Sequence, residues 1–262
     1  MENNSEILNL ALVQMDLVWE NRDENLTQIS ALLEKMKQQP DVIVLPETFA
    51  SGFSMNAQKV AETMDGRTVE WMKETARNHQ LAVCGSVFIE ENGSYYNRFI
   101  WVNPGSEVFT YNKRHLFSMG KEDSVYTKGE EQTLISYKGW LIFPQICYDV
   151  RFPVWSRNTH FYDILLNVAN WPAPRRKVWK TLLKARAIEN QCYVLGVNRL
   201  GRDGNGINYS GDSLIVSPKG ELLGNAKDNA EILFAELNRT TLHAFRKKFD
   251  TLKDADQFQI QA

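Results

Sequence analysis

The sequence predicts a fold of mixed α/β layers, and two observations support this class. Short apolar runs typical of strands alternate along the chain with segments whose apolar residues recur at helical spacing. The 262 residues are 43% hydrophobic and 24% charged, a balance typical of a globular protein with a sizeable core. Because no repeat, low-complexity segment or Pro/Gly/Ser-rich linker interrupts the alternation, we expect one domain over residues 1–262.

In the N-terminal half, each expected element has its own local pattern. Ile7–Met15 is an apolar run typical of a strand, and Asn25–Gln38 carries apolar residues at helical spacing. Asp41–Leu45 is typical of a strand buried on both faces, which places Glu47 just after a strand end. The remaining expected elements are a helix over Val69–Asn78 and a hairpin of the strands Leu81–Ile89 and Tyr95–Val102.

The C-terminal half repeats the alternation, and its second expected strand leads directly to Cys147. Strands are expected at Leu134–Tyr137, Trp140–Ile146, Ile164–Val168, Tyr193–Asn198, Asp212–Val216, Glu221–Leu223 and Ile232–Glu236. Helices are expected near Pro153–His160, Arg175–Gln191 and Thr240–Phe249.

Charge and hydropathy exclude two classes of partner. Lys and Arg total 30 against 32 Asp and Glu, a net charge of −2 that offers no overall attraction for phosphates, so we predict no nucleic-acid role. Nowhere do about 18 apolar residues run together without charge, so we predict no transmembrane helix and no membrane partner.

The cysteines indicate a reducing compartment. Cys84, Cys147 and Cys192 are odd in number and lack Cys-x-x-Cys spacing, which argues against a disulfide framework or a zinc ribbon. The segment Met1–Glu6 is polar and acidic, unlike a secretory signal. We therefore expect a cytoplasmic protein.

Cys147 has a setting suited to chemistry. It follows a strand and precedes a predicted helix, a turn where a side chain can be exposed and helix-end amides can favour a thiolate. A free cysteine is more commonly a small buried apolar residue, so its type alone does not make it a nucleophile. Covalent amide hydrolysis also needs a group that carries a proton and donors for the oxyanion.

Three residues are candidates for those supporting roles. Glu47 stands after a nearly all-apolar strand, an unusual place for a carboxylate, although capping or solvent-facing roles are commoner for a lone glutamate. Lys113 by itself would be a solvated surface lysine in most proteins. His115, close to Lys113, is the only credible histidine base, so a Cys-His mechanism stays an alternative.

Three segments taken together resemble the nitrilase superfamily of carbon-nitrogen hydrolases. They are Leu-Pro-Glu-Thr-Phe at 45–49, Tyr-Asn-Lys-Arg-His-Leu-Phe at 111–117 and Ile-Cys-Tyr-Asp-Val-Arg-Phe-Pro at 146–153, in matching order and spacing. The resemblance extends from Ala-Leu-Val-Gln at 11–14 to residues 211–221. Cys-Tyr-Asp-x-Arg-Phe-Pro and Ala-Asn-Trp-Pro at 169–172 look most like the omega-amidase branch, which releases ammonia from the terminal amide of 2-oxo acid amides.

The resemblance implies a Glu-Lys-Cys triad. Cys147 would be the nucleophile, Glu47 the proton carrier, and Lys113 with the backbone amide of Tyr148 the oxyanion donors. It implies a thioester intermediate and no metal or organic cofactor. The fold implied is a four-layer α-β-β-α sandwich of the nitrilase type, and the assembly a homodimer or higher homo-oligomer.

A second glutamate is implied by the same resemblance. Glu122, after the lysine loop, would order the lysine and the substrate amide. The loop at 118–123 diverges locally, and Asp123 stands next to Glu122, so either carboxylate remains a candidate for this role.

A small anionic amide substrate needs a cation and an apolar wall. Arg175, at a predicted helix start, is our candidate for the substrate carboxylate. We expect Arg151 to form a structural ion pair near the nucleophile turn and leave it out of the site. The aromatic candidates for the wall, which could equally be core residues, are Phe53, Phe117 and Trp171.

Other functions remain open beside hydrolysis of 2-oxoglutaramate or 2-oxosuccinamate. The same triad would serve a thiol acyltransferase, which passes the acyl group to a nucleophile other than water, or an amidase of another short aliphatic amide. A catalytically inactive binding module is a third class. Modification of Cys147 by iodoacetamide, slowed by substrate, separates an active thiol from inert packing.

Overall fold

The computed structural model describes residues 5–260. The expectation of no secretory signal rests on Met1–Glu6, of which residues 1–4 lie outside the described part. Within residues 5–260, no helix is both long enough and apolar enough to cross a membrane.

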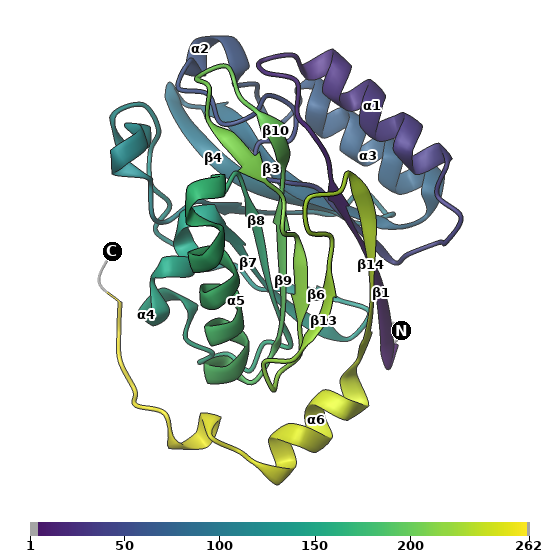
Figure 1. The fold of residues 1–262 in the computed structure, drawn as a ribbon, viewed down its shortest axis with the longest axis vertical. Coiled ribbons are helices and arrows are strands. Elements are labelled where there is room, and N and C mark those ends of the chain that lie inside the picture. Colours follow the sequence, from purple (N-terminus) through teal and green to yellow (C-terminus); the bar gives the residue numbers. More distant parts are fainter. Residues whose placement is uncertain (1–4, 261–262) are drawn as a thin grey trace.

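Two six-stranded sheets form the centre of the molecule (Figure 1). The first has the order β14-β1-β2-β3-β4-β5. In it β2 pairs in parallel with β1 and β3, and the other neighbours are antiparallel. Its strands are β1 (Ile7–Gln14), β2 (Val42–Val44), β3 (Ala82–Glu91), β4 (Ser94–Val102), β5 (Val108–Asn112) and β14 (Glu231–Asn238).

The second sheet has the order β13-β12-β9-β8-β7-β6. Here β8 is the strand with two parallel neighbours, β7 and β9. The two sheets thus share a design in which short parallel strands, buried on both faces, occupy the middle. The strands are β6 (Ile135–Tyr137), β7 (Trp140–Ile146), β8 (Ile164–Ala169), β9 (Tyr193–Asn198), β12 (Leu214–Val216) and β13 (Leu222–Asn225).

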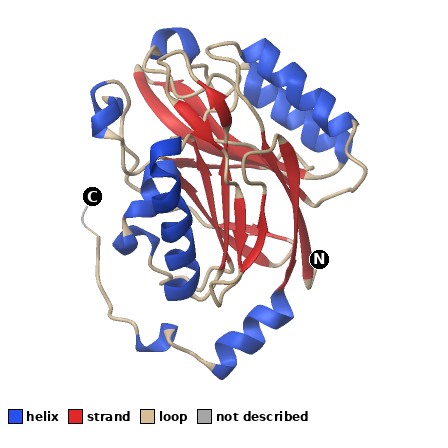
Figure 2. Cartoon of the chain, in the orientation of Figure 1, coloured by secondary structure: helices blue, strands red, loops and turns tan. Residues whose placement is uncertain are grey.

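Helices cover the outer face of each sheet (Figure 2). α1 (Arg22–Glu34) and α3 (Arg67–His79) pack on the first sheet, and α5 (Arg176–Asn190) packs on the second. Alternate residues of β2 serve the two layers: Val44 belongs to the core between the sheets, and Ile43 to the core under α1 and α3. The expected four-layer α-β-β-α sandwich is confirmed.

Short elements complete the chain. A small hairpin of β10 (Leu200–Arg202) and β11 (Asn208–Ser210) stands apart from the two sheets. The remaining helices of the described part are α2 (Ala57–Val60), α4 (Pro153–Ser156), α6 (Arg239–Lys248) and the 3-10 turns Ser118–Gly120, Glu122–Ser124, Cys147–Arg151, Ala173–Arg175 and Leu252–Asp254.

Several boundaries differ from the sequence prediction. α1 begins three residues earlier than expected because the Asn21 side chain caps it by accepting a hydrogen bond from the Glu24 amide. The helix expected at Pro153–His160 is a single turn, since Arg157 already has extended backbone. β5 and the β10–β11 hairpin were not predicted, because strands this short carry little periodic signal.

Candidate active site

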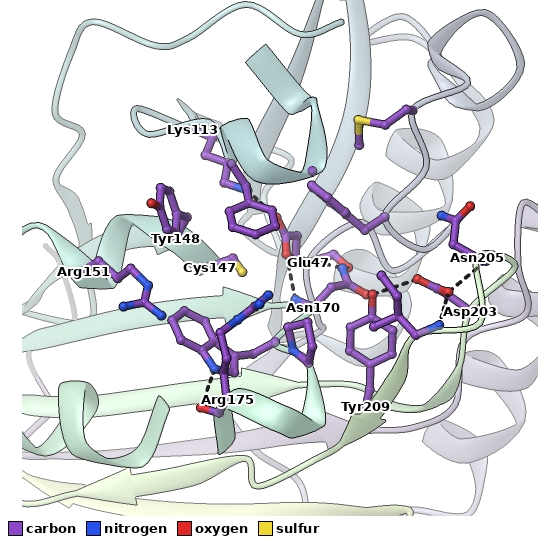
Figure 3. Close-up of a pocket in the computed structure, with 17 residues that line it drawn as sticks. Glu47, Lys113, Cys147, Tyr148, Arg151, Asn170, Arg175, Asp203, Asn205 and Tyr209 are labelled. Atoms are coloured by element: carbon purple, nitrogen blue, oxygen red, sulfur yellow. Dashed lines mark hydrogen bonds and ion pairs between the residues drawn. The ribbon is translucent and has the colours of Figure 1, made fainter. Parts of the chain in front are cut away.

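Three sequence-predicted residues line one cavity (Figure 3). Glu47 follows β2, Lys113 follows β5 and Cys147 follows β7, so both sheets contribute to the site. Thr48 (φ +44°) and Cys147 (φ +47°) have left-handed backbone, which costs energy for residues other than glycine. Strained turns therefore present both the carboxylate and the thiol.

The floor of the cavity is a fully buried charge cluster. The Lys113 ammonium lies 2.8 Å from Glu47 Oε1 and 2.9 Å from Glu122 Oε2. The three side chains are at most 1% exposed. One ammonium thus holds two carboxylates in a water-poor setting, where each of its contacts is strengthened by the low dielectric.

Of the two carboxylates considered for the lysine loop, Glu122 is the one in the site. Besides Lys113, it accepts a hydrogen bond of 2.6 Å from the Phe117 amide. Its neighbour Asp123 is exposed to solvent. The two neighbours belong to the 3-10 turn Glu122–Ser124, in which successive side chains point in different directions, so only Glu122 is buried.

Two asparagines hold Glu47, and neither was among the predicted site residues. Asn97, buried in β4, donates to Glu47 Oε1 at 2.8 Å and to Glu122 Oε1 at 3.2 Å. Asn170 donates its backbone amide to Glu47 Oε2 at 2.7 Å and its side-chain amide to the Glu47 carbonyl at 2.7 Å. An Asn in the middle of an otherwise buried strand was the available signal for Asn97, since buried polar groups require partners.

The cluster sets the protonation of its members. Burial by itself lowers the pKa of Lys113, but the negative charges of Glu122 and Glu47 more than offset it, so the pKa rises above its ordinary value. Burial raises the pKa of Glu122, against the lowering effect of Lys113, and the charge of Glu47 adds to the rise. The lysine is therefore a permanent cation.

Cys147 differs from the expectation of a helix-stabilised thiolate. Burial raises its pKa well above the ordinary range, and the charge of Glu47 adds to the rise, whereas Lys113 and a backbone hydrogen bond with Asn170 oppose it. The turn at Cys147–Arg151 is too short to supply a strong dipole. In the resting protein the sulfur is therefore a thiol.

His115, the alternative base, is engaged elsewhere. Its Nδ1 lies 2.8 Å from Asp149 Oδ1, and its ring stacks on Phe152. It does not belong to the lining of the cavity that holds Cys147. The geometry therefore favours Glu47 over His115 as the partner of the thiol.

The four predicted substrate-binding residues line the same cavity. Arg175 is half-buried, and we call its side of the cavity the mouth (Figure 3). The Arg175 guanidinium lies 5.3 Å from the centre of the Phe117 ring, and Lys113 Nζ lies 5.1 Å from that of Phe53. Trp171 is buried and donates its ring N–H to the Arg175 carbonyl at 2.9 Å.

The expectation of an ion pair for Arg151 is wrong. Arg151 also lines the cavity, and its guanidinium lies 5.0 Å from the centre of the Trp171 ring and 5.8 Å from that of Tyr148. Within residues 5–260, no carboxylate lies within ion-pair distance of it. Aromatic rings therefore hold this guanidinium, and its hydrogen-bond donors remain available.

The β10–β11 hairpin supplies a wall that the sequence did not predict. Asp203, Asn205, Ile207 and Tyr209 line the cavity opposite Arg151. The Asp203 carboxylate shapes the hairpin by accepting from the amides of Asn205 and Ile207 and from the Tyr209 hydroxyl, each at 2.9 Å. Because three donors already bind the Asp203 carboxylate, we assign it a role in shaping the wall.

In the described part of the chain, no cluster of three or more His, Cys, Asp or Glu side chains has an arrangement that could hold a metal ion. The polar groups at the floor are instead paired with one another.

Comparisons with known proteins identify the family. The carbon-nitrogen hydrolase family pattern matches residues 9–247. The chain is 45% identical to the omega-amidase YafV of Escherichia coli strain K12 over 254 residues, 97% of this chain and 98% of that protein. It is 35% identical to the 2-oxoglutaramate amidase of Bacillus subtilis strain 168 over 235 residues, 87% and 90% of the two chains.

A solved structure agrees with this grouping. The crystal structure of XC1258 from Xanthomonas campestris, a CN-hydrolase superfamily protein with an arsenic adduct in its active site, superposes with a TM-score of 0.95 at 39% identity, covering 98% of this chain and 100% of that chain. The family pattern over most of the chain and the near full-length relatives lead to one conclusion: the chain belongs to the carbon-nitrogen hydrolase family.

Proposed function

We propose that this chain is an omega-amidase that hydrolyses the terminal amide of short 2-oxo dicarboxylic acid monoamides, such as 2-oxoglutaramate and 2-oxosuccinamate, to the acid and ammonia. The names of two relatives, omega-amidase and 2-oxoglutaramate amidase, support the substrate class. The observation that carries the reaction type is the buried Glu47–Lys113 pair, which lines the same cavity as Cys147.

Acylation begins with transfer of the Cys147 proton to Glu47. Glu47 Oε1 already accepts from Lys113 and Asn97 at 2.8 Å each. Oε2 accepts from the Asn170 backbone amide at 2.7 Å and from the Asn170 side-chain amide at 3.4 Å. The 3.4 Å contact is long for a hydrogen bond, so Oε2 is the oxygen better able to take the proton. The thiolate then attacks the amide carbon, and a tetrahedral oxyanion forms.

Two donors suit that oxyanion. The Lys113 ammonium is a permanent cation at the floor, and the Tyr148 amide belongs to the first turn of a 3-10 segment, where N–H groups lack partners within the segment. Collapse of the intermediate breaks the carbon-nitrogen bond, and Glu47 returns the proton to the departing nitrogen, which leaves as ammonia. A thioester on Cys147 remains.

Deacylation uses the same carboxylate. Glu47 takes a proton from water, the resulting hydroxide attacks the thioester carbon, and Cys147 leaves as a thiolate that recovers the proton from Glu47. Glu122 has no proton to move in this scheme. Its two oxygens hold Lys113, and in the complex it would orient the amide nitrogen of the substrate.

The substrate carboxylate would bind at the mouth, between Arg175 and Arg151. Both guanidinium groups stack on aromatic rings and lack a carboxylate partner within residues 5–260. Guanidinium forks match a carboxylate in two-point contacts. Because Cys147 lines the same cavity, a substrate with its carboxylate at these guanidinium groups would direct its amide toward the thiol.

The direct test is ammonia release by Cys147→Ala with 2-oxoglutaramate. We expect no turnover above background, with the melting temperature of the wild type retained, because no other group can form the thioester. Cys192→Ala, which removes a buried thiol outside the cavity, is the matched control and should keep its kcat. Turnover by Cys147→Ala would contradict the proposal.

Two further properties belong to this proposal. A reducing cytoplasm would suit an enzyme that depends on a free thiol.

A homodimer would cover apolar side chains that α4 and α5 leave exposed, such as Val154, Val178 and Ile188. Light scattering during gel filtration should give a mass of about twice that of the chain, or a higher multiple for a larger homo-oligomer. A purely monomeric species would contradict the assembly but not the reaction.

A further inference from the structure

Asp149 is a buried carboxylate that the mechanism does not use. It is 0% exposed and is absent from the lining of the active-site cavity. Four donors converge on it: Tyr111 Oη at 2.7 Å and the Ile146 amide at 3.0 Å on Oδ2, and the His115 amide at 2.9 Å and His115 Nδ1 at 2.8 Å on Oδ1. Its hydrogen-bonding capacity is therefore filled.

The donors come from the two segments that carry the chemistry. Tyr111 and His115 lie two residues before and two residues after Lys113. Ile146 directly precedes Cys147, and Asp149 lies two residues after it. A single carboxylate thus joins the backbone on both sides of the lysine to the turn that holds the nucleophile.

Further contacts restrict the movement of the Tyr111 and His115 side chains that bind Asp149. Tyr111 Oη also accepts from the Trp155 ring N–H at 3.1 Å. Trp155, in α4, therefore helps to fix the position of the Tyr111 hydroxyl. The His115 and Phe152 rings stack with centroids 3.7 Å apart and planes 6° apart. Because a carboxylate can only accept, His115 Nδ1 must carry a hydrogen toward Asp149.

The contacts of Asp149 meet two requirements of the active site. Cys147 has a strained positive φ, which persists only where surrounding contacts over-determine the turn. Lys113 must also stay at a fixed place beside the thiol if it is to stabilise the oxyanion. The contacts of Asp149 act on both backbone segments at once.

We propose that Asp149, through Tyr111 and His115, is a positioning residue that sets Lys113 against Cys147. Asp149 itself touches neither the substrate nor the reacting atoms. The turnover part of its test rests on the proposed amidase function, whereas the thiol-reactivity part depends only on Cys147 and its neighbours.

Two substitutions at His115 separate hydrogen bonding from packing. H115F keeps a ring to stack on Phe152 but loses the Nδ1 donor, and H115N loses the ring but keeps a nitrogen donor at the same branch of the side chain. Y111F removes the other side-chain donor. D149N is the less informative variant, because an amide cannot accept from all four donors, so loss of folding and loss of positioning would not be separated.

For each variant we would measure kcat and KM for 2-oxoglutaramate, the melting temperature, and the pH dependence of Cys147 alkylation by iodoacetamide. H115F should lower kcat by about tenfold or more with KM within about twofold, since small displacements of reacting groups cost orders of magnitude. Its alkylation midpoint should move to higher pH, because a retreating Lys113 no longer favours the thiolate. H115N should recover most of the loss.

A purely structural role predicts a different result. In that case H115F and Y111F lower the melting temperature but keep the wild-type kcat and alkylation midpoint, and the proposal is overturned. It is also overturned if H115N is as slow as H115F, since ring stacking would then be the feature that matters. H79F, the same substitution at an exposed histidine, should match the wild type.

Failure of the proposed amidase function can be distinguished from failure of the positioning role. If wild-type protein releases no ammonia from any omega-amide, the amidase assignment is wrong, yet the alkylation midpoints of H115F, H115N and wild type still decide whether Asp149 positions the site.

Discussion

The charged side chains at the floor and at the mouth of the cavity differ in burial and in pairing. At the floor, Glu47, Lys113 and Glu122 are almost completely buried, and each has charged partners within 3 Å. At the mouth, Arg151 and Arg175 are half-buried and rest on aromatic rings, with no carboxylate partner in the described part of the chain. The floor is complete without a ligand, whereas the mouth is complete only with an anion.

The difference follows from desolvation. Buried ions cost several kcal/mol each unless they are paired with good geometry, so the floor has to be preorganised. A half-buried guanidinium keeps much of its hydration, so leaving it without a carboxylate partner costs little free energy. We therefore expect substitutions at the floor to reduce kcat and those at the mouth to raise KM.

The largest effect is expected for Glu47→Gln. Loss of the proton carrier should lower kcat by about a hundredfold to ten-thousandfold. The thiol should nevertheless become more reactive: the charge of Glu47 raises the pKa of Cys147, so its removal lowers that pKa and moves the alkylation midpoint to lower pH. Steady-state kinetics and iodoacetamide alkylation measure the two effects. Parallel loss of turnover and alkylation would mean that Glu47 only maintains the fold of the site.

Lys113→Met tests the other half of the floor. Two buried carboxylates lose their cation, so the free energy of unfolding should fall by about 3–5 kcal/mol. kcat should fall by about a hundredfold to a thousandfold because an oxyanion donor is lost. Urea denaturation and kinetics would check both, with the exposed Lys128→Met as the control. Wild-type stability would show that the cluster is not held by this ammonium.

The residues of the floor were largely predictable from the sequence. Glu47, Lys113 and Cys147 each follow a strand within a short segment whose residue types and order are specific. Asn97 was not predicted, because a polar residue within β4 has no local pattern that reveals its partners. Its contacts with Glu47 and Glu122 arise only when residues 25 and 50 positions away come together in the fold.

The mouth was less predictable for a physical reason. Arg151 lies four residues from Cys147, but whether a carboxylate or an aromatic ring faces it depends on how the layers pack. The β10–β11 hairpin has three-residue strands and several glycines, so its pattern resembles a loop. Only the cross-strand pairing of Leu200–Arg202 with Asn208–Ser210 defines it. The layered fold was predictable because its central strands are continuous apolar runs.

At the mouth, Arg175→Met should raise KM for 2-oxoglutaramate by about tenfold to a hundredfold with little change in kcat, the expected loss of a charge-assisted carboxylate contact. Arg151→Met should act in the same direction. Arg176→Met is the matched control, because Arg176 is paired with Asp212 and lies outside the cavity. A neutral short amide should show no such increase in KM. An equal increase for both substrates would contradict carboxylate recognition.

The smallest effect is expected at the hairpin. Tyr209→Phe keeps the ring that lines the cavity and removes one hydrogen bond to Asp203, whose two backbone donors remain. We expect a loss of about 1 kcal/mol in the free energy of unfolding and a change in KM of less than about threefold. Kinetics beside urea denaturation would check this. A large fall in kcat would mean that Tyr209 takes part in the chemistry.

The covalent step at the floor is tested most directly by intact-protein mass spectrometry after rapid acid quenching of enzyme with 2-oxoglutaramate. Wild-type protein should gain the mass of the substrate less one ammonia, and Cys147→Ala should gain nothing. Proteolysis should place the added mass on the peptide that contains Cys147. Steady ammonia release without such a species at any quench time, or the same added mass on Cys147→Ala, would contradict the thioester mechanism.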